Sequence, residues 1–253
     1  LFTAAHHANE WITATVLLKF AEELSRAILE KGSVYGIPAN LFEENCQIFL
    51  VPMVDPDGVD LVTGGIPLGS VQWEKARNLA GNYPAIPFPN GWKANLLGID
   101  LNLQYPAGWL QAREIKFSQG YTRPGPRDYV GKAPLTQRES RALADFTRYL
   151  DPALILAYHT QGEQIYWKYD DIDVPGALAL GQEFARLSGY ALAETPYVSG
   201  FAGYKDWFIK IWRRPGFTIE AGLGENPLPL SQFDSIYAKN LGILTTAALG
   251  LPE

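Results

Sequence analysis

The sequence predicts a single α/β domain. Short apolar segments of strand length alternate with longer segments in which apolar residues recur every three or four positions, as in amphipathic helices. The short segments lack the polar alternation of a half-exposed strand, which indicates a sheet buried on both faces. The chain has 253 residues, of which 47% are hydrophobic and 19% are charged, so it can bury a sizeable core and wholesale disorder is excluded.

Four helices are expected. The first begins near Asn9 and ends at Lys31, which a glycine follows. Its apolar residues keep helical spacing: Ile12, Val16, Leu17, Phe20, Leu24 and Ile28. The others are expected over residues 136–150, 175–188 and 231–249. A capping box of Thr136 and Glu139 predicts the start of the second helix, and Ser231 is expected to cap the last one.

Strands are expected over residues 47–54, 96–100, 153–158 and 217–220, and the third is followed directly by His159. The run Asp55-Pro56-Asp57-Gly58 predicts a turn. Residues 62–95 and 104–134 are rich in glycine and proline and are interpreted as loops. Loops of this length are uncommon in a compact domain unless they have a function, so we expect them to build a site.

Charge and composition exclude several classes of protein. The formal net charge is −6, which argues against a nucleic-acid or anionic-membrane partner because both favour basic surfaces. The longest nearly uncharged stretch near the end, residues 241–252, is far shorter than the ~20 residues of a membrane span. One cysteine excludes an internal disulfide and a cysteine-rich metal site. With three histidines, any histidine metal site must be small and must also use carboxylates.

The histidines suggest a metal site. His7 and Glu10 form H-x-x-E at the start of the first helix, and this spacing places both side chains on one helical face. His159 follows an apolar strand, where α/β proteins place functional groups. Catalytic zinc sites use three such ligands and a water. The structural alternative is that His7 caps the helix and that Glu10 interacts with the helix dipole.

Other catalytic motifs are missing from the sequence. It contains neither H-E-x-x-H nor G-x-S-x-G. The run from Gly125 to Lys132 has one residue too many for a phosphate-binding loop, and Ala133 stands where such a loop has Ser or Thr. A zinc protease of the H-E-x-x-H type, a serine hydrolase and a nucleotide triphosphatase are therefore not favoured.

Six motifs occur in a fixed order: H-A-N-E-W-I-T at residues 7–13, D-P-D-G at 55–58, W-K-A-N at 92–95, G-I-D-L-N at 98–102, Y-H-T-Q-G at 158–162 and T-I-E at 218–220. Together they resemble the zinc carboxypeptidase (carboxypeptidase A-like) superfamily over essentially the whole chain. The resemblance implies a three-layer α/β/α fold with a mixed, mostly parallel, twisted central sheet.

The resemblance also implies roles for particular residues. His7, Glu10 and His159 would bind one Zn²⁺, Glu220 would be the general base, and Asp100 would orient the first zinc histidine. Lys93 stands where many members have an arginine that polarises the scissile carbonyl, although a solvated loop lysine is an equal alternative. The substrate-binding residues would be Asn102, Tyr197 and Asp206. Of these, Tyr197 aligns with the family's mobile tyrosine, because it leads into the Lys205-Asp206-Trp207 segment.

One departure from the family bears on the substrate. Exopeptidases of this family have Asn-Arg in the G-x-D motif, where arginine binds the terminal carboxylate, but here Leu103 follows Asn102. The surrounding W-K-A-N, P-R-D-Y and G-Y-K-D-W-F-I runs are similar to those of bacterial γ-D-glutamyl-L-diamino acid endopeptidases. That branch cleaves the γ-D-Glu–meso-diaminopimelate bond of peptidoglycan stem peptides. Its substrate carries several carboxylates and an amine, for which the candidate partners are Arg123, Arg127, Lys132 and Lys205.

Two alternatives remain at this point: a zinc carboxypeptidase acting on ordinary peptides, and a non-catalytic peptidoglycan-binding pseudo-enzyme. Residues 1–253 are expected to be one catalytic domain with no nucleic-acid partner and no membrane span. Its oligomeric state is not set by the sequence. The first five residues are expected to be the last strand before the zinc ligands, so the domain is expected to lack its first strands. The resemblance favours a secreted or wall-associated bacterial protein over a cytoplasmic one.

Overall fold

A computed structural model describes residues 1–250 and contains a mixed six-stranded sheet in the order β4-β1-β5-β8-β6-β7. The strands are β1 (Phe2–Thr3), β4 (Leu50–Val51), β5 (Ile155–His159), β6 (Gln164–Tyr166), β7 (Ala191–Ala193) and β8 (Gly216–Glu220). Neighbouring strands are parallel except for β6 and β8, which are antiparallel. A separate hairpin pairs β2 (Ser33–Val34) with β3 (Ile37–Pro38). The expected strand within the first five residues is confirmed as β1.

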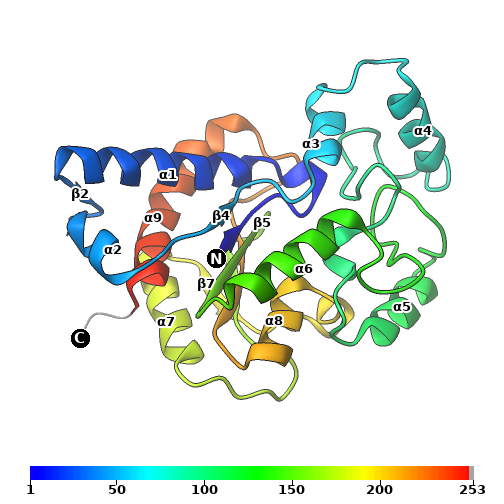
Figure 1. Cartoon of the computed structure of the whole chain (residues 1–253). Coiled ribbons are helices and arrows are strands. Elements are labelled where there is room, and N and C mark those ends of the chain that lie inside the picture. The colour runs from blue at the N-terminus through cyan, green and yellow to red at the C-terminus, as the bar shows by residue number, and fades with distance from the viewer. Residues whose placement is uncertain (251–253) are drawn as a thin grey trace.

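Helices cover both faces of this sheet (Figure 1). On one face lie α1 (Ile12–Glu30), α7 (Ala177–Ser188) and α9 (Phe233–Leu249), and on the other lie α6 (Arg138–Leu150) and α8 (Tyr204–Trp212). Strand β5 shows why both faces are covered. Leu156 and Tyr158 pack into the first core, whereas Ile155 and Ala157 pack into the second, as the alternation of side chains along a strand requires. The predicted three-layer α/β/α class is confirmed.

Residues 55–134 form a lobe beside the sheet, on the right in Figure 1. This lobe contains α3 (Pro56–Thr63), α4 (Val71–Ala80), a short 3₁₀ turn (Leu101–Leu103) and α5 (Trp109–Ser118). Trp92, which is fully buried, packs there with Leu61 and Ala76 of the first two helices. The interpretation of residues 62–95 and 104–134 as plain loops was therefore wrong.

The missed helices have local causes in the sequence. At α4 the Ser70 hydroxyl caps the helix by accepting a hydrogen bond from the Trp73 N–H at 3.2 Å. The run 55–58 begins α3 and is not a turn, because Asp55 is its N-cap and Pro56 occupies the first helical turn. Aspartate, proline and glycine serve both structures, so their presence alone does not separate a turn from a helix start.

Two expected strands differ from the structure. Residues 96–100 form no strand, because the side-chain oxygen of Asn95 accepts hydrogen bonds from the N–H groups of Leu97 and Ile99 and holds this segment as a tight loop. Of residues 47–54, only Leu50 and Val51 pair in the sheet. The expected strands at 153–158 and 217–220 are confirmed as β5 and β8, the first extended to include His159.

Two predicted caps were also wrong. Thr136 does not cap α6; its hydroxyl donates to Gln104 Oε1 at 3.0 Å, and Gln137 is the N-cap residue. Ser231 lies inside a 3₁₀ turn (Leu230–Gln232) that precedes α9. The sequence did not predict β6, β7, α8, the β2–β3 hairpin or α2 (Asn40–Asn45).

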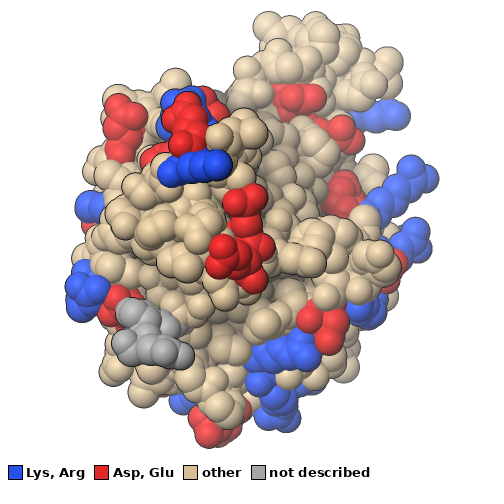
Figure 2. Space-filling model, turned by 60° about the vertical axis from the view of Figure 1, so that its left-hand side comes forward, with Lys and Arg blue, Asp and Glu red and all other residues tan. Residues whose placement is uncertain are grey.

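The surface agrees with the low charge content of the chain. Figure 2 shows acidic and basic side chains dispersed over one face with wide uncharged areas between them. None of the helices within residues 1–250 combines the length and the apolar character that crossing a bilayer demands.

Replacing the α3 cap Asp55 by Asn is expected to change how stability depends on pH. Burial raises the pKa of Asp55 well above its usual range. The pKa of this carboxyl is thus higher in the folded state than in the unfolded chain, where it is about 3.9. The stabilisation from the uncharged carboxyl is complete only below pH ~3.9, and it is lost as the pH rises toward the folded-state pKa. Asparagine keeps the capping oxygen and has no charge to bury. Urea unfolding should therefore favour D55N over wild type by a larger free energy of unfolding at pH ~8 than at pH ~5. An equal difference at both pH values would contradict this account.

Candidate functional site

A cleft of about 910 Å³ opens where β5 and β8 end. His159 and Glu220 are the last residues of these two strands, and they are paired in register, so their side chains point to the same face of the sheet. The lobe of residues 55–134 supplies the facing wall, including Lys93, Asp100 and Arg127. The expectation that the long segments build a site is met in this cleft.

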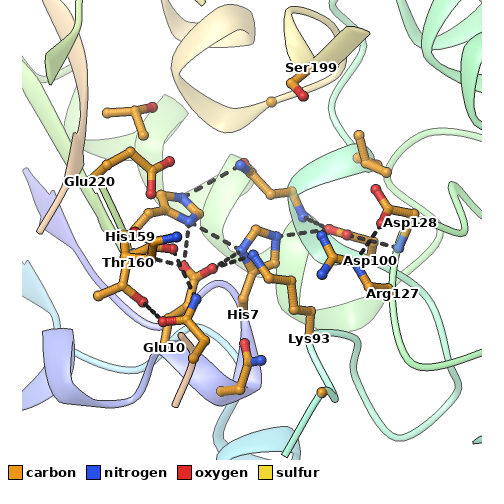
Figure 3. Close-up of a pocket in the computed structure, with 18 of the residues that line it drawn as sticks. His7, Glu10, Lys93, Asp100, Arg127, Asp128, His159, Thr160, Ser199 and Glu220 are labelled. Atoms are coloured by element: carbon orange, nitrogen blue, oxygen red, sulfur yellow. Dashed lines mark hydrogen bonds and ion pairs between the residues drawn. The ribbon is translucent and has the colours of Figure 1, made fainter. Parts of the chain in front are cut away.

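Three of the predicted residues converge at the base of the cleft. His7 Nδ1 lies 3.0 Å from Glu10 Oε1 and 3.2 Å from His159 Nδ1, and His159 Nδ1 lies 2.9 Å from Glu10 Oε2 (Figure 3). One donor atom from each residue lies within 4.8 Å of the others. Two ligands of one tetrahedral zinc ion are about 3.3 Å apart when each bond is about 2.0–2.1 Å long, so this spacing fits such an ion.

Local structure explains how His7 and Glu10 meet. His7 is the N-cap residue of a 3₁₀ turn (Ala8–Glu10) that leads into α1, so the two residues stand one turn apart. Glu10 is 1% exposed and its Oε2 also accepts a hydrogen bond from the Thr160 N–H at 3.2 Å. Burial alone would raise the pKa of Glu10, but His7 and Lys93 outweigh it and hold the pKa well below its usual range. The carboxylate is therefore ionised and available to a cation.

Asp100 fixes the other side of His7. Its Oδ1 lies 3.1 Å from His7 Nε2, and its Oδ2 accepts a hydrogen bond from the Asp128 N–H at 3.2 Å. With Nε2 engaged by a carboxylate, Nδ1 is directed at Glu10 and His159. Burial opposes the charge on His7, but Glu10 and Asp100 outweigh burial and raise the pKa of His7 to about 9.

Glu220 and Lys93 flank this centre. Burial raises the pKa of Glu220 above its usual value, although the nearby His159 acts against that shift. Lys93 Nζ lies 2.6 Å from Glu10 Oε1. Burial would lower the pKa of Lys93, but the carboxylate of Glu10 outweighs burial and raises it. The site thus combines a half-buried carboxylate of raised pKa with a lysine whose pKa is raised.

Two of the three expected substrate-binding residues line the cleft. Asn102 Oδ1 accepts a hydrogen bond from the Tyr204 N–H at 3.0 Å, and its Nδ2 lies 3.5 Å from His159 Nε2. Asp206 Oδ2 accepts from the Gly203 N–H at the start of α8. Tyr197 does not line the cleft: it is 71% exposed and packs edge-on against Phe201. The role expected for Tyr197, that of a mobile residue that reaches the substrate, stays a prediction.

The structure separates the four basic candidates. Arg127 and Lys205 line the cleft, whereas Arg123 and Lys132 do not. It also adds Lys116, which sequence reasoning missed, because a lysine in a predicted loop is expected to be solvated. Lys116 is 9% exposed and its Nζ lies 2.6 Å from Asp128 Oδ1. Asp128 belongs to the P-R-D-Y run that marked the resemblance, and this run was the sequence feature that could have pointed to a paired lysine nearby.

An α/β domain that gathers two imidazole nitrogens, a carboxylate and a further, half-buried glutamate at the ends of two parallel strands has the composition of a metallohydrolase. Residues 1–240 match the family model described as zinc carboxypeptidase, and the chain belongs to that family, as the motifs predicted.

Individual relatives agree with this membership. γ-D-Glutamyl-L-diamino acid endopeptidase 1 of Lysinibacillus sphaericus is 44% identical over 242 residues, which are 96% of this chain and 59% of that protein. The crystal structure of thrombin activatable fibrinolysis inhibitor has a TM-score of 0.70 at 17% identity and covers 99% of this chain and 62% of that chain. Carboxypeptidase A from Helicoverpa armigera has a TM-score of 0.66 at 16% identity, with 97% and 59% covered. Both structures show the shared fold, and the chain spans about three fifths of each of these proteins.

Proposed function

We propose that this chain carries the catalytic site of a zinc metallopeptidase that hydrolyses the γ-D-glutamyl–meso-diaminopimelate bond of peptidoglycan stem peptides. The observation that carries the proposal is the convergence of His7, Glu10 and His159 beside Glu220 in a cleft that a peptide can enter. The substrate class is supported by the similarity to the Lysinibacillus endopeptidase. Such a substrate favours action at a bacterial cell wall.

In this proposal His7 Nδ1, one oxygen of Glu10 and His159 Nδ1 hold a single Zn²⁺. Three donors that face one another within 4.8 Å, each on a buried or half-buried residue, are suited to that ion. When bound there, zinc supplies Lewis acidity, which lowers the pKa of a water toward ~7 and polarises a carbonyl oxygen. Asp100 keeps the His7 ring oriented through Nε2.

The chain's own residues then move the proton and stabilise charge. Glu220 takes the proton of the attacking water and returns it to the leaving amine, a task for which its raised pKa is suited. Lys93, as a protonated point charge, stabilises the oxygen that becomes negative on the substrate carbonyl. Asn102 and Asp206 contribute to substrate binding from the cleft wall.

A peptide panel tests the activity. We expect zinc-loaded protein to convert L-Ala-γ-D-Glu-meso-diaminopimelate-D-Ala into L-Ala-D-Glu and meso-diaminopimelate-D-Ala, measured by mass spectrometry. A zinc chelator should abolish the reaction, and added zinc should restore it.

The same panel separates the alternatives. Release of D-Ala alone, or of C-terminal residues from ordinary α-linked peptides with the γ bond intact, would identify a carboxypeptidase. Against that outcome stands Leu103, an apolar residue that lines the cleft at the expected position of the carboxylate-binding arginine. Binding of the wall peptide without turnover would identify a non-catalytic binder.

A further inference from the structure

The proposed substrate requires a cationic partner that Leu103 cannot provide, and this inference rests on the proposed function. A stem peptide carries three free carboxylates, on the glutamyl residue, on the diamino acid and at the terminus. A carboxylate that leaves water for a cleft must be paired and hydrogen-bonded. Among residues 1–250, the lysines and arginines that line the cleft are Lys93, Lys116, Arg127 and Lys205.

Three of these cations are already engaged by anions of the protein. Lys93 Nζ pairs with Glu10 and is already assigned to the carbonyl oxygen of the scissile bond, and Lys116, whose side chain is 11% exposed, has its Nζ 2.6 Å from Asp128 Oδ1. Lys205 Nζ donates to the carbonyl oxygen of Lys168 at 2.6 Å and lies 2.6 Å from Asp206 Oδ1. Lys205 is only 4% exposed, so its charge is both compensated and largely out of reach.

Arg127 differs because its donors are only partly used. Its Nε donates to Asp128 Oδ2 at 2.7 Å, and this is the sole hydrogen bond of its guanidinium within residues 1–250. The side chain is 40% exposed and lines the cleft. Figure 3 shows Arg127 on the Lys93 and Asp100 side of the histidines, across from Glu220. Its two Nη groups are the paired donors that match a carboxylate.

Asp128 is itself held in place, which orients the arginine. Its Oδ1 pairs with Lys116, its Oδ2 receives Arg127 Nε, and its N–H donates to Asp100 Oδ2. Two cations share one carboxylate, so the group of Lys116, Arg127 and Asp128 keeps a net positive charge. A side chain ordered in advance loses less conformational entropy when it binds a ligand.

We propose that Arg127 is a specificity-determining residue that binds a carboxylate of the substrate through its two Nη groups, with Asp128 and Lys116 as its positioning residues. The group that Arg127 binds is a carboxylate, and each of the three carboxylates of the stem peptide is a candidate for it. Recognition of the anionic group is then a function of the lobe and does not depend on the residue at position 103.

The test combines single amides of the substrate with variants of the arginine. The parent tetrapeptide is compared with three analogues, each with one of its carboxylates converted to a carboxamide. We expect wild type to cleave one analogue with a kcat/KM about 10- to 100-fold lower than that of the parent, as for loss of a charged hydrogen-bonded pair. The kcat/KM of R127Q on the parent should be about that of wild type on this analogue. R127Q should also cleave the parent and this analogue with equal kcat/KM. The kcat/KM of R127K on the parent should lie between those of wild type and R127Q, because lysine keeps the positive charge but lacks the paired N–H donors of arginine.

The control is R123Q, which removes the same charge from an exposed arginine outside the cleft and should keep the wild-type pattern. An equal loss in R127Q on all four peptides would overturn the proposal, as would a wild type that treats all four alike. Zinc content and circular dichroism establish whether the variants are folded. If R127Q is not folded, R127K replaces it in the comparison with wild type.

Failure of the proposed function would be seen separately. If wild type cleaves none of the four peptides, the γ-glutamyl activity fails, and the carboxylate site is then tested by titrating zinc-loaded protein with glutarate. A Kd about tenfold higher in R127Q than in wild type and R123Q would support the assignment. An unchanged Kd, or no binding by wild type, would overturn it.

Discussion

Replacement of Glu220 by Gln is expected to lower kcat/KM on the γ-D-glutamyl peptide by about 10³- to 10⁴-fold, near the upper end of what general acid–base catalysis contributes. Glutamine fills the same space at the end of β8 but cannot accept the proton of the attacking water. Zinc content and thermal stability should stay close to those of wild type, because His7, Glu10 and His159 are unchanged. Steady-state kinetics together with metal analysis measure both quantities.

Glu30→Gln is the matched control for this substitution, since it makes the same chemical change at the exposed end of α1. It should leave kcat/KM unchanged. Wild-type turnover by E220Q would remove Glu220 from the mechanism. Loss of zinc in E220Q would instead show that the residue acts through the metal site.

The second large effect is expected from His159→Ala, which removes one of three proposed ligands. Zinc affinity should fall by more than about 100-fold, because loss of a residue that merely supports a ligand already costs about 10- to 100-fold. Activity should fall with it at zinc concentrations that saturate wild type. Competition with a chromophoric chelator gives the affinity.

Asp100→Asn provides the graded comparison for His159→Ala. It leaves all three donor atoms in place and changes only groups that support His7, namely the contact with His7 Nε2 and the hydrogen bond accepted from the Asp128 N–H, so its loss of affinity should stay within about 10- to 100-fold. Equal losses in the two variants would contradict the proposed division between ligand and support.

The strands that carry the site were predictable because they are buried on both faces. A continuous apolar run identified β5 and the short Phe-Thr-Ile-Glu segment identified β8, and both end on the residues that the motifs single out. The helices of the lobe were not predictable in this way. Within α4 only Ala76 and Ala80 are buried, so the apolar periodicity is weak and the Ser70 cap was the remaining signal.

At the site, sequence motifs predicted which residues meet but not which charges are already paired. Lys205 and Arg127 were equivalent candidates in the sequence. They differ in the contacts and exposure that the fold gives them: Lys168 and Asp206 hold the buried lysine, whereas Asp128 occupies just Nε of the 40% exposed arginine. Tyr197 is expected to be mobile, and its side chain lies outside the cleft in this structure, so its role at the substrate stays a prediction.

The register that pairs His159 with Glu220 sets where the chain can change length. Adding or deleting one residue within β5 or β8 would turn one of these side chains to the opposite face of the sheet and separate the proton acceptor from the metal ligands. The number of residues in the lobe is not constrained by strand register, because its helices are joined by turns and loops. Insertions and deletions in parts of the lobe away from Lys93, Asp100 and Arg127 could therefore reshape what the cleft admits while the reaction at the strand ends stays the same.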